Sequence, residues 1–217
     1  MDLYPVWLSL RVAFFATVLT FALGLPTAWA LARRTFAGRE LLGALIVSPL
    51  VLPPTVLGYY LLLVISNRGP VGRAFGALGI ELAFTWRAAL LAACVGSFPL
   101  FVKAAQAGFE TVDRRLEQAA RTLGHSEWSV FRAVTLPLAW RSVLAGAVLA
   151  YCRAFGDFGI TLMVAGSIPG RTQTVPLAIY DYVQADRMGS ANALAMATVA
   201  AIVVLLLGLS RLVRLRF

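Results

Sequence analysis

The segment from Glu117 to Pro137, EQAARTLGHSEWSVFRAVTLP, is a polar island in an otherwise apolar chain. Of the 217 residues, 60% are hydrophobic and 13% are charged, and the mean hydropathy is +0.81. Because soluble domains carry about 25% charged residues, this composition indicates one integral membrane domain over residues 1–217. A membrane protein that keeps such a charged segment between spans is expected to bind a soluble partner with it.

The island is predicted to fold as a helix, a turn and a second short helix. Gly124 suits the left-handed cap that ends a helix, and Ser126 can cap the helix that follows. Glu117 and Arg121 are one helical turn apart, which predicts an ion pair on the exposed face. Three apolar side chains would anchor the second helix: Trp128, Val130 and Phe131. A solvated interfacial loop is the alternative interpretation that the residues alone leave open.

Five segments are long and apolar enough to cross a bilayer, which takes about 20 predominantly apolar residues. They are Val12–Leu31, Leu41–Ile65, Trp86–Ala107, Ala139–Ala165 and Ala191–Leu212. The start of the chain lacks the basic region of a signal peptide, so we expect the first span to be retained. The sequence therefore predicts an all-α membrane protein with five transmembrane helices.

The basic residues predict the orientation of these spans. The net charge is +9, and many of the 19 basic residues gather in three places. These are Arg33, Arg34 and Arg39; Lys103, Arg114, Arg115, Arg121, Arg132 and Arg141; and Arg211, Arg214 and Arg216. Alternate loops that hold such clusters lie in the cytoplasm. We therefore expect the N-terminus outside and the C-terminus in the cytoplasm, with a cytoplasmic loop at about 110–138 and an extracytoplasmic loop at about 167–190. Because the basic residues serve this orientation, we expect no nucleic-acid partner.

Prolines interrupt the second predicted span. Pro49, Pro53 and Pro54 each remove an intrahelical hydrogen bond, and Thr55 follows them. In lipid, the freed carbonyls have to be satisfied by neighbours, by water or by hydroxyl groups. The break is therefore either a plain kink or part of a pathway lined by Pro53, Pro54 and Thr55. The third span repeats the pattern more weakly at Ser97–Pro99.

Two opposite charges fall within the fourth predicted span. Arg153 and Asp157 are four residues apart and so share one helix face. A lone charge at the bilayer centre costs about 2.5–3.5 kcal/mol on insertion scales, and a neighbouring opposite charge offsets part of that cost. We expect a structural ion pair; the alternative is that Arg153 faces a path for an anionic solute.

Residues for chemistry on the chain itself are scarce. The one lysine, Lys103, is not in a Gly-Lys-Ser/Thr context, so a phosphate-binding P-loop is excluded. The one histidine, His125, has no catalytic partner at a suggestive spacing. Cys94 and Cys152 sit in apolar runs and are expected to act as small apolar residues. We therefore expect no cofactor, no metal and no catalytic site, and an intramembrane enzyme is poorly supported.

The island resembles the cytoplasmic loop of binding-protein-dependent ABC importer permeases. That loop reads Glu-Ala-Ala, three residues, Gly, nine residues, an aliphatic residue, one residue and Leu-Pro. The matching positions here are Ala119, Ala120, Gly124, Val134, Leu136 and Pro137. Gln118 stands where the motif has Glu, and the acid comes one residue earlier, at Glu117. This arrangement is similar to the Leu-Glu-x-x-Ala form of the molybdate branch.

The resemblance extends over nearly the whole chain. Leu52–Val56 is similar to the second-span signature of molybdate and sulfate permeases. Gly156–Gly159 resembles the Gly-Glu-Phe-Gly stretch of the fourth span, with Asp in place of Glu. Ile168–Thr174 and Pro176–Tyr180 look most like the molybdate branch.

This resemblance implies a type I ABC importer permease of MetI-like fold, in the inner membrane and surrounded by lipid. It implies a homodimer that docks a cytoplasmic ATPase dimer through Glu117, Gln118, Ala119, Ala120, Gly124 and Pro137. A periplasmic or lipid-anchored binding protein would deliver molybdate, and ATP-driven motion would give alternating access. A sulfate or tungstate permease, and a stand-alone channel or secondary transporter, are the alternatives.

Overall fold

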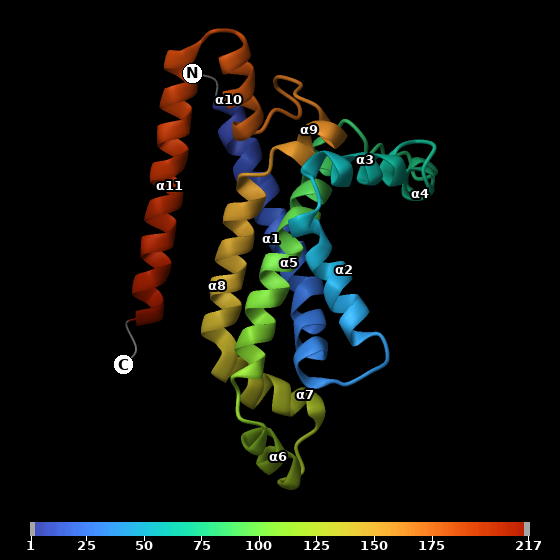
Figure 1. Cartoon of the computed structure of the whole chain (residues 1–217), viewed down its shortest axis with the longest axis vertical. Helices are drawn as coiled ribbons and strands as arrows, with labels where there is room; N and C mark the ends of the chain where they lie inside the picture. Colours follow the sequence, from blue (N-terminus) through green and yellow to red (C-terminus); the bar gives the residue numbers. More distant parts are fainter. Residues whose placement is uncertain (1–2, 215–217) are drawn as a thin grey trace.

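The computed structural model describes residues 3–214, which are helical throughout apart from connecting turns (Figure 1). Three long helices, α1 (Tyr4–Arg33), α5 (Trp86–Glu110) and α8 (Leu136–Phe155), pack side by side as the core. A fourth, α11 (Met188–Arg214), stands beside them and contacts α10 (Val175–Gln184) and α8. Four helices of the described chain are long and apolar enough to span a membrane, or five if a bent pair counts as one span.

Small residues let the core helices approach closely. A Cβ atom on Gly108 of α5 would lie 2.3 Å from the Ser142 Cβ of α8, and one on Gly24 of α1 would lie 2.6 Å from the Phe101 ring of α5. Buried alanines line the same interfaces. Within lipid, helices associate by close van der Waals contact rather than by the hydrophobic effect. The small residues therefore determine how α1, α5 and α8 pack.

The second predicted span is not one continuous helix. It consists of α2 (Arg39–Val51) and α3 (Pro54–Ile65), which are bent by 114°. Pro53 and Pro54 have no N–H to continue the helix, and the residue before a proline is pushed out of the helical conformation. Leu52 and Pro53 accordingly have extended ψ angles of 143° and 133°. Pro49 stays inside α2, so only the double proline changes the chain direction.

The fourth predicted span is wrong in its extent. The helix α8 ends at Phe155, and a separate short helix, α9 (Gly159–Ala165), follows. Before α8, the chain forms a π-helical turn, η1 (Phe131–Thr135). The predicted kink at Ser97–Pro99 does not divide α5, which runs unbroken from Trp86 to Glu110.

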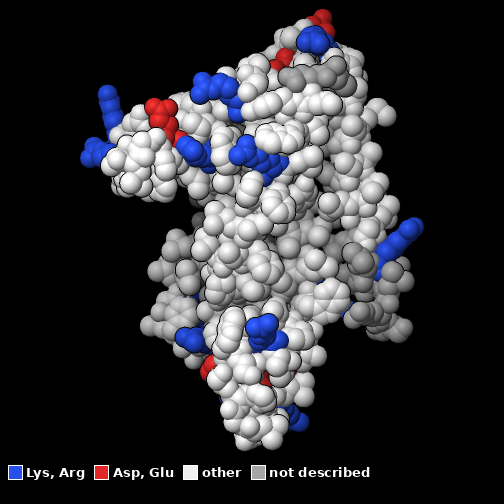
Figure 2. All heavy atoms as spheres, turned by 180° about the vertical axis from the view of Figure 1, so that it is seen from behind, with Lys and Arg blue, Asp and Glu red and all other residues white. Residues whose placement is uncertain are grey.

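The short elements lie at opposite ends of the bundle (Figure 1). The helices α6 (Arg114–Thr122) and α7 (Glu127–Val130) project at one end, and α3, α4 (Pro70–Gly76), α9 and α10 gather at the other. Charged side chains concentrate toward these two ends, and a largely uncharged belt lies between them on the face shown in Figure 2. Of the predicted basic tail, the side chain of Arg214 and all of Arg216 lie outside the described residues.

Candidate functional site

The island folds as a helix, a turn and a helix, which confirms the prediction. Gly124 has a φ of +86°, the left-handed region that favours glycine. The Ser126 hydroxyl accepts a hydrogen bond from the Ser129 N–H at 3.3 Å and caps α7. Val130 and Phe131 are buried as predicted, but Trp128 is 68% exposed. The turn therefore depends on local residues and leaves an aromatic side chain uncovered.

The predicted ion pair between Glu117 and Arg121 is wrong. Glu117 is only 3% exposed, and its Oε1 lies 3.0 Å from Arg33 Nη2 at the end of α1. The same oxygen accepts a hydrogen bond from the Thr135 hydroxyl at 2.7 Å. Arg121 instead pairs with Glu127 of α7, with 2.6 Å between Nε and Oε1. Glu117 turns away because the face of α6 that carries it packs against the bundle.

The Arg121–Glu127 pair ties α6 to α7 on the solvent side. The hydrogen bond from Arg121 lowers the pKa of the Glu127 carboxyl, and the same bond raises the pKa of Arg121. A lowered carboxyl pKa stabilises the fold above its unfolded pKa, and that contribution is lost as the pH falls through the folded value. Both side chains are largely exposed, at 40% and 59%, so the contribution is small.

Several apolar side chains of α6 and α7 are exposed. Leu116 is 50% exposed and Leu123 is 81% exposed. Gln118 and Ala119 are exposed beside them, and Ala120 is half-buried. Exposed apolar groups that gather in one place are typical of binding surfaces. We call the exposed surface of these two helices, on which Leu116, Gln118, Ala119, Leu123 and Trp128 lie, the α6–α7 face.

The two helix breaks lie against each other at the opposite end. A Cβ atom on Gly159, the first residue of α9, would lie 2.7 Å from the Pro54 Cβ at the start of α3. One on Gly58 would lie 2.6 Å from the Met163 Cβ of α9. These glycines allow α3 and α9 to pack in contact. Pro53 and Thr55, predicted as pathway residues, are exposed beside this contact.

Arg153 and Asp157 form the predicted ion pair, with 2.9 Å between Nη1 and Oδ1. The Asp157 side chain is 2% exposed, and its Oδ2 accepts hydrogen bonds from the Thr161 N–H and hydroxyl at 3.0 and 2.7 Å. The pair packs on α5, because a Cβ on Gly96 would lie 3.3 Å from Arg153 Nη2. Asp157 lies beyond the end of α8 and caps α9. The break in the fourth crossing is thus held by a buried, fully bonded carboxylate.

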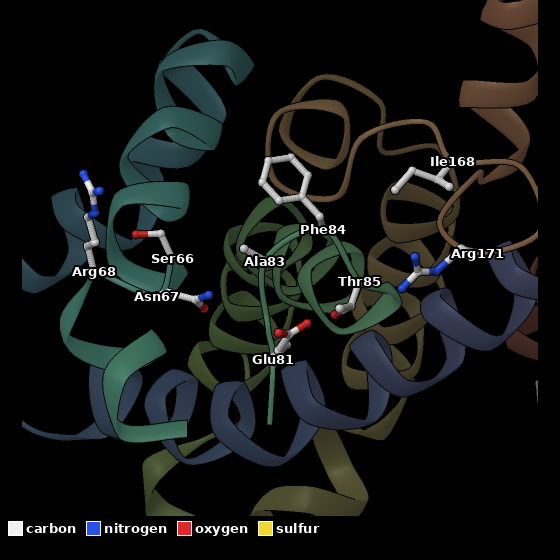
Figure 3. Close-up of a pocket in the computed structure, with 9 residues that line it drawn as sticks. All are labelled: Ser66, Asn67, Arg68, Glu81, Ala83, Phe84, Thr85, Ile168 and Arg171. Atoms are coloured by element: carbon white, nitrogen blue, oxygen red, sulfur yellow. The ribbon is translucent and has the colours of Figure 1, made fainter. Parts of the chain in front are cut away.

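A cavity of about 480 Å³ opens at the same end (Figure 3). Its walls are the residues after α3, the residues before α5 and the loop after α9: Ser66, Asn67, Arg68, Glu81, Ala83, Phe84, Thr85, Ile168 and Arg171. The Arg171 side chain points into the cavity toward Thr85. Phe84 has a φ of +56° and donates its N–H to the Val164 carbonyl of α9 at 2.9 Å. Such backbone strain in a bulky residue often marks a functional position.

Sequence reasoning missed several of these residues. Arg33 was used as a marker of orientation, and Thr135 was passed over within the motif. The cavity arginines, Arg68 and Arg171, had no pattern that could join them across the chain. Within the described residues, no three His, Cys, Asp or Glu side chains lie close enough to hold a metal ion. Cys94 and Cys152 are free and half-buried.

Comparison with known families decides what this arrangement is. The model for the "binding-protein-dependent transport system inner membrane component" family matches residues 20–215. The chain belongs to this family. It is thus an inner-membrane component of a transport system, and its apolar helices are long enough to cross that membrane.

Relatives of this inner membrane component support the assignment. It is 46% identical over 185 residues to the molybdenum transport system permease protein ModB of Escherichia coli K12, covering 83% of this chain and 81% of the relative. It is 33% identical over 201 residues to a probable sulfate transport system permease protein, cysT, of Chlorella vulgaris, covering 92% and 76%. A chain of the MetNI methionine ABC transporter superimposes with a TM-score of 0.74 at 20% identity, covering 97% of this chain and 93% of that chain. That likeness shows the type I, MetI-like fold.

We predict that Arg153→Ala destabilises this inner membrane component more than the double change of Arg153→Ala and Asp157→Asn. The single change leaves a buried carboxylate without its counter-charge, which costs about 3–5 kcal/mol. The double change removes that charge and keeps a polar cap for α9. The thermal unfolding midpoint in detergent measures the difference. Equal midpoints for the two variants would contradict the structural pair.

Proposed function

We propose that this permease is the translocation subunit of an ATP-driven molybdate importer, in which the α6–α7 face binds a separate ATPase subunit. The observation that carries the proposal is the position of this face: it is exposed, it carries apolar side chains, and α5 and α8 join it to the helix breaks at the other end. The 46% identical relative is described as a molybdenum transport permease. Members of this family work with a separate ATPase, which carries out the hydrolysis.

The α6–α7 end is the cytoplasmic end in this proposal. Arg33, Arg34, Arg39 and the arginines of α6 gather there, and cytoplasmic loops carry such an excess of basic residues. The N-terminus is then outside and the C-terminus inside, with five crossings if α2 and α3 count as one. The loop that couples the permease to the ATPase spans about residues 110–138, and Glu117, Gln118, Ala119, Ala120, Gly124 and Pro137 belong to it.

The contact between the two helix breaks is the proposed moving part of the pathway. Pro53, Pro54 and Thr55 on one side and Arg153 and Asp157 on the other flank it. A dianion in a dry apolar site would face a desolvation cost of tens of kcal/mol. The path must therefore be hydrated, and freed backbone groups at the breaks can serve as its donors and acceptors. Displacement of α3 against α9 would open or close such a path.

A second copy of the chain and lipid cover the remaining apolar surface. In the apolar stretch of α11, only 6% of the residues are buried within one copy. Exposed apolar side chains also lie along α3 and α4, among them Tyr59, Tyr60, Leu63 and Phe75. A pathway lined by one copy alone would be open along α3, and a symmetric partner closes it in the homodimer that we propose.

The cavity at the outer end receives the binding protein in this proposal. Three charged residues line it, Arg68, Glu81 and Arg171, and all three are exposed. Mixed charges around a hollow of this size suit a protein loop of complementary charge better than a free anion. Since the walls continue into α3 and α9, docking there would act on the helix breaks.

Sulfate is the second candidate substrate, and the 33% identical relative described as a sulfate permease favours it. Molybdate, tungstate and sulfate are tetrahedral dianions, so the same hydrated path suits all three. Molybdate is preferred because the relative with the higher identity is described as a molybdenum permease.

We predict that Gly124→Val weakens association with the ATPase at least about 5-fold. A side chain in the left-handed region costs about 1–2 kcal/mol, and a β-branched residue is a genuine outlier there. Gly170→Val is the matched control, because Gly170 has a φ of +72° and equally open surroundings at the outer end. Co-purification in detergent measures the association. Equal loss in both variants would contradict docking at α6 and α7.

We predict that proteoliposomes with permease, ATPase and binding protein take up labelled molybdate only with ATP. Excess tungstate should suppress uptake because its size and charge are nearly those of molybdate, whereas sulfate should compete weakly. Uptake without the ATPase subunit would indicate a channel or a secondary transporter. Equal competition by sulfate would favour the second candidate.

We predict that Arg171→Glu raises the binding-protein concentration needed for half-maximal ATPase stimulation about 10-fold. Reversing a charge that faces the docked partner turns an attraction into a repulsion. Arg73→Glu in α4 is the control, since Arg73 is exposed at the same end but does not line the cavity. The same rise in both variants would show a general charge effect instead of a contact in the cavity.

A further inference from the structure

The carboxylate of Glu117 lies where the docking helix meets the ends of all three core helices. Arg33 in the last turn of α1 reaches its Oε1 at 3.0 Å, and Thr135, just before α8, donates to it at 2.7 Å. The same Nη2 of Arg33 donates to the Val112 carbonyl, just after α5, at 2.8 Å. We call Arg33, Glu117, Thr135 and the Val112 carbonyl the charged joint.

Burial distinguishes the charged joint from the other ion pairs at this end. The side chains of Arg33 and Glu117 are 8% and 4% exposed. Those of Arg39 and Glu110 are 40% and 47% exposed, and their closest N–O distance is 3.8 Å. An exposed pair is screened by water and contributes little. A buried pair cannot lose one partner without leaving a charge unpaired in a medium of low dielectric constant.

Arg33 depends strongly on this carboxylate. Among the described residues, its buried Nε has no hydrogen-bond partner, so its Nη2 contacts with Glu117 and Val112 hold the guanidinium in place. The next residue of the motif, Gln118, is exposed on the α6–α7 face. Adjacent positions thus have different surroundings: Glu117 is buried against the bundle, and Gln118 is exposed.

We propose that Glu117 is a positioning residue that transmits the motion of the ATPase-bound helix α6 to α1, α5 and α8, and that it does not contact the ATPase. This proposal rests on the proposed docking of the ATPase at α6 and α7. Displacement of α6 moves a carboxylate to which α1 and the start of α8 are both bonded. The residues that contact the ATPase are then Gln118 and the exposed apolar residues of the α6–α7 face.

The proposal predicts that binding of the ATPase and coupling of ATP hydrolysis to transport can be disturbed separately. A change at Gln118 alters how tightly the ATPase binds. A change in the charged joint leaves the α6–α7 face intact but loosens its connection to the spans. The ATPase would then bind and hydrolyse ATP without moving the helix breaks.

The test uses the complete importer in proteoliposomes, with labelled molybdate as the transported probe. The variants are Glu117→Gln, Arg33→Gln, their double combination, Arg33→Lys and Gln118→Ala. Arg39→Gln is the control, because it removes the same charge from an exposed pair at the same end. Each complex is measured for ATPase co-purification, thermal midpoint, ATP hydrolysis and molybdate taken up per ATP hydrolysed.

We expect Glu117→Gln and Arg33→Gln to co-purify with the ATPase as wild type does and to lose at least 10-fold in uptake per ATP. The double variant should be no worse than either single variant, because the two residues act as one pair. Arg33→Lys, which keeps a positive charge, should recover part of the coupling. Arg39→Gln should couple as wild type, and Gln118→Ala should lower co-purification.

Two outcomes would overturn the proposal. If Glu117→Gln loses the ATPase while its thermal midpoint is unchanged, Glu117 is a docking contact. If its uptake per ATP equals that of wild type, the charged joint has no role in transmission. The same conclusion holds if coupling is lost only in variants whose thermal midpoint falls, and Arg33→Lys shows the same fall. Failure of the wild-type permease to co-purify with an ATPase would instead refute the proposed function.

Discussion

A backbone that crosses hydrocarbon must satisfy its own hydrogen bonds, and this constraint shapes the whole molecule. The four long helices meet it internally. The two breaks differ in how they meet it: the α8–α9 break is buried at Asp157, whereas residues 51–56 at the α2–α3 break are exposed in the single chain. At α8–α9, the Asp157 carboxylate accepts the Thr161 N–H and is itself paired with Arg153. At α2–α3, Pro54 has no N–H to satisfy and packs on Gly159. The contact between Pro54 and Gly159 thus joins the two breaks.

The same long helices also connect the two ends of the molecule. Close contacts through Gly108 and Gly24 keep α1, α5 and α8 together as a core. The short helices α3 and α9 pack on each other at one end, and α6 and α7 project at the other. Rigid helices that join the two ends can carry a displacement from one end to the other without large internal rearrangement. The buried Arg33–Glu117 pair lies where α6 meets this core.

Much of this architecture could be predicted from the sequence, because hydropathy, glycine and capping residues act locally. Gly124 and Ser126 specified the turn between α6 and α7, and the spacing of Arg153 and Asp157 specified their pair. The 114° bend between α2 and α3 could not be predicted, since a double proline ends a helix without giving the direction of the next one.

The partner of Glu117 was predicted wrongly for a similar reason. Helical spacing places Arg121 within reach, but tertiary packing brings Arg33 closer from 84 positions earlier in the chain. The cavity beside α3 and α9 escaped prediction as well, because Arg68 and Arg171 line one hollow only once α3 and α9 are packed. Long-range contacts of this kind leave no periodic pattern in a single sequence.

The most direct test of the central claim is a cross-link between the α6–α7 face and an ATPase subunit. Cys94 and Cys152 would be replaced by alanine, and single cysteines introduced at Leu123, 81% exposed, and at Leu78, 73% exposed at the opposite end. In the assembled importer, the cysteine at position 123 should form a covalent adduct with the ATPase, and the one at position 78 should not. An adduct at position 78, or none at position 123 in a complex that co-purifies intact, would contradict the account.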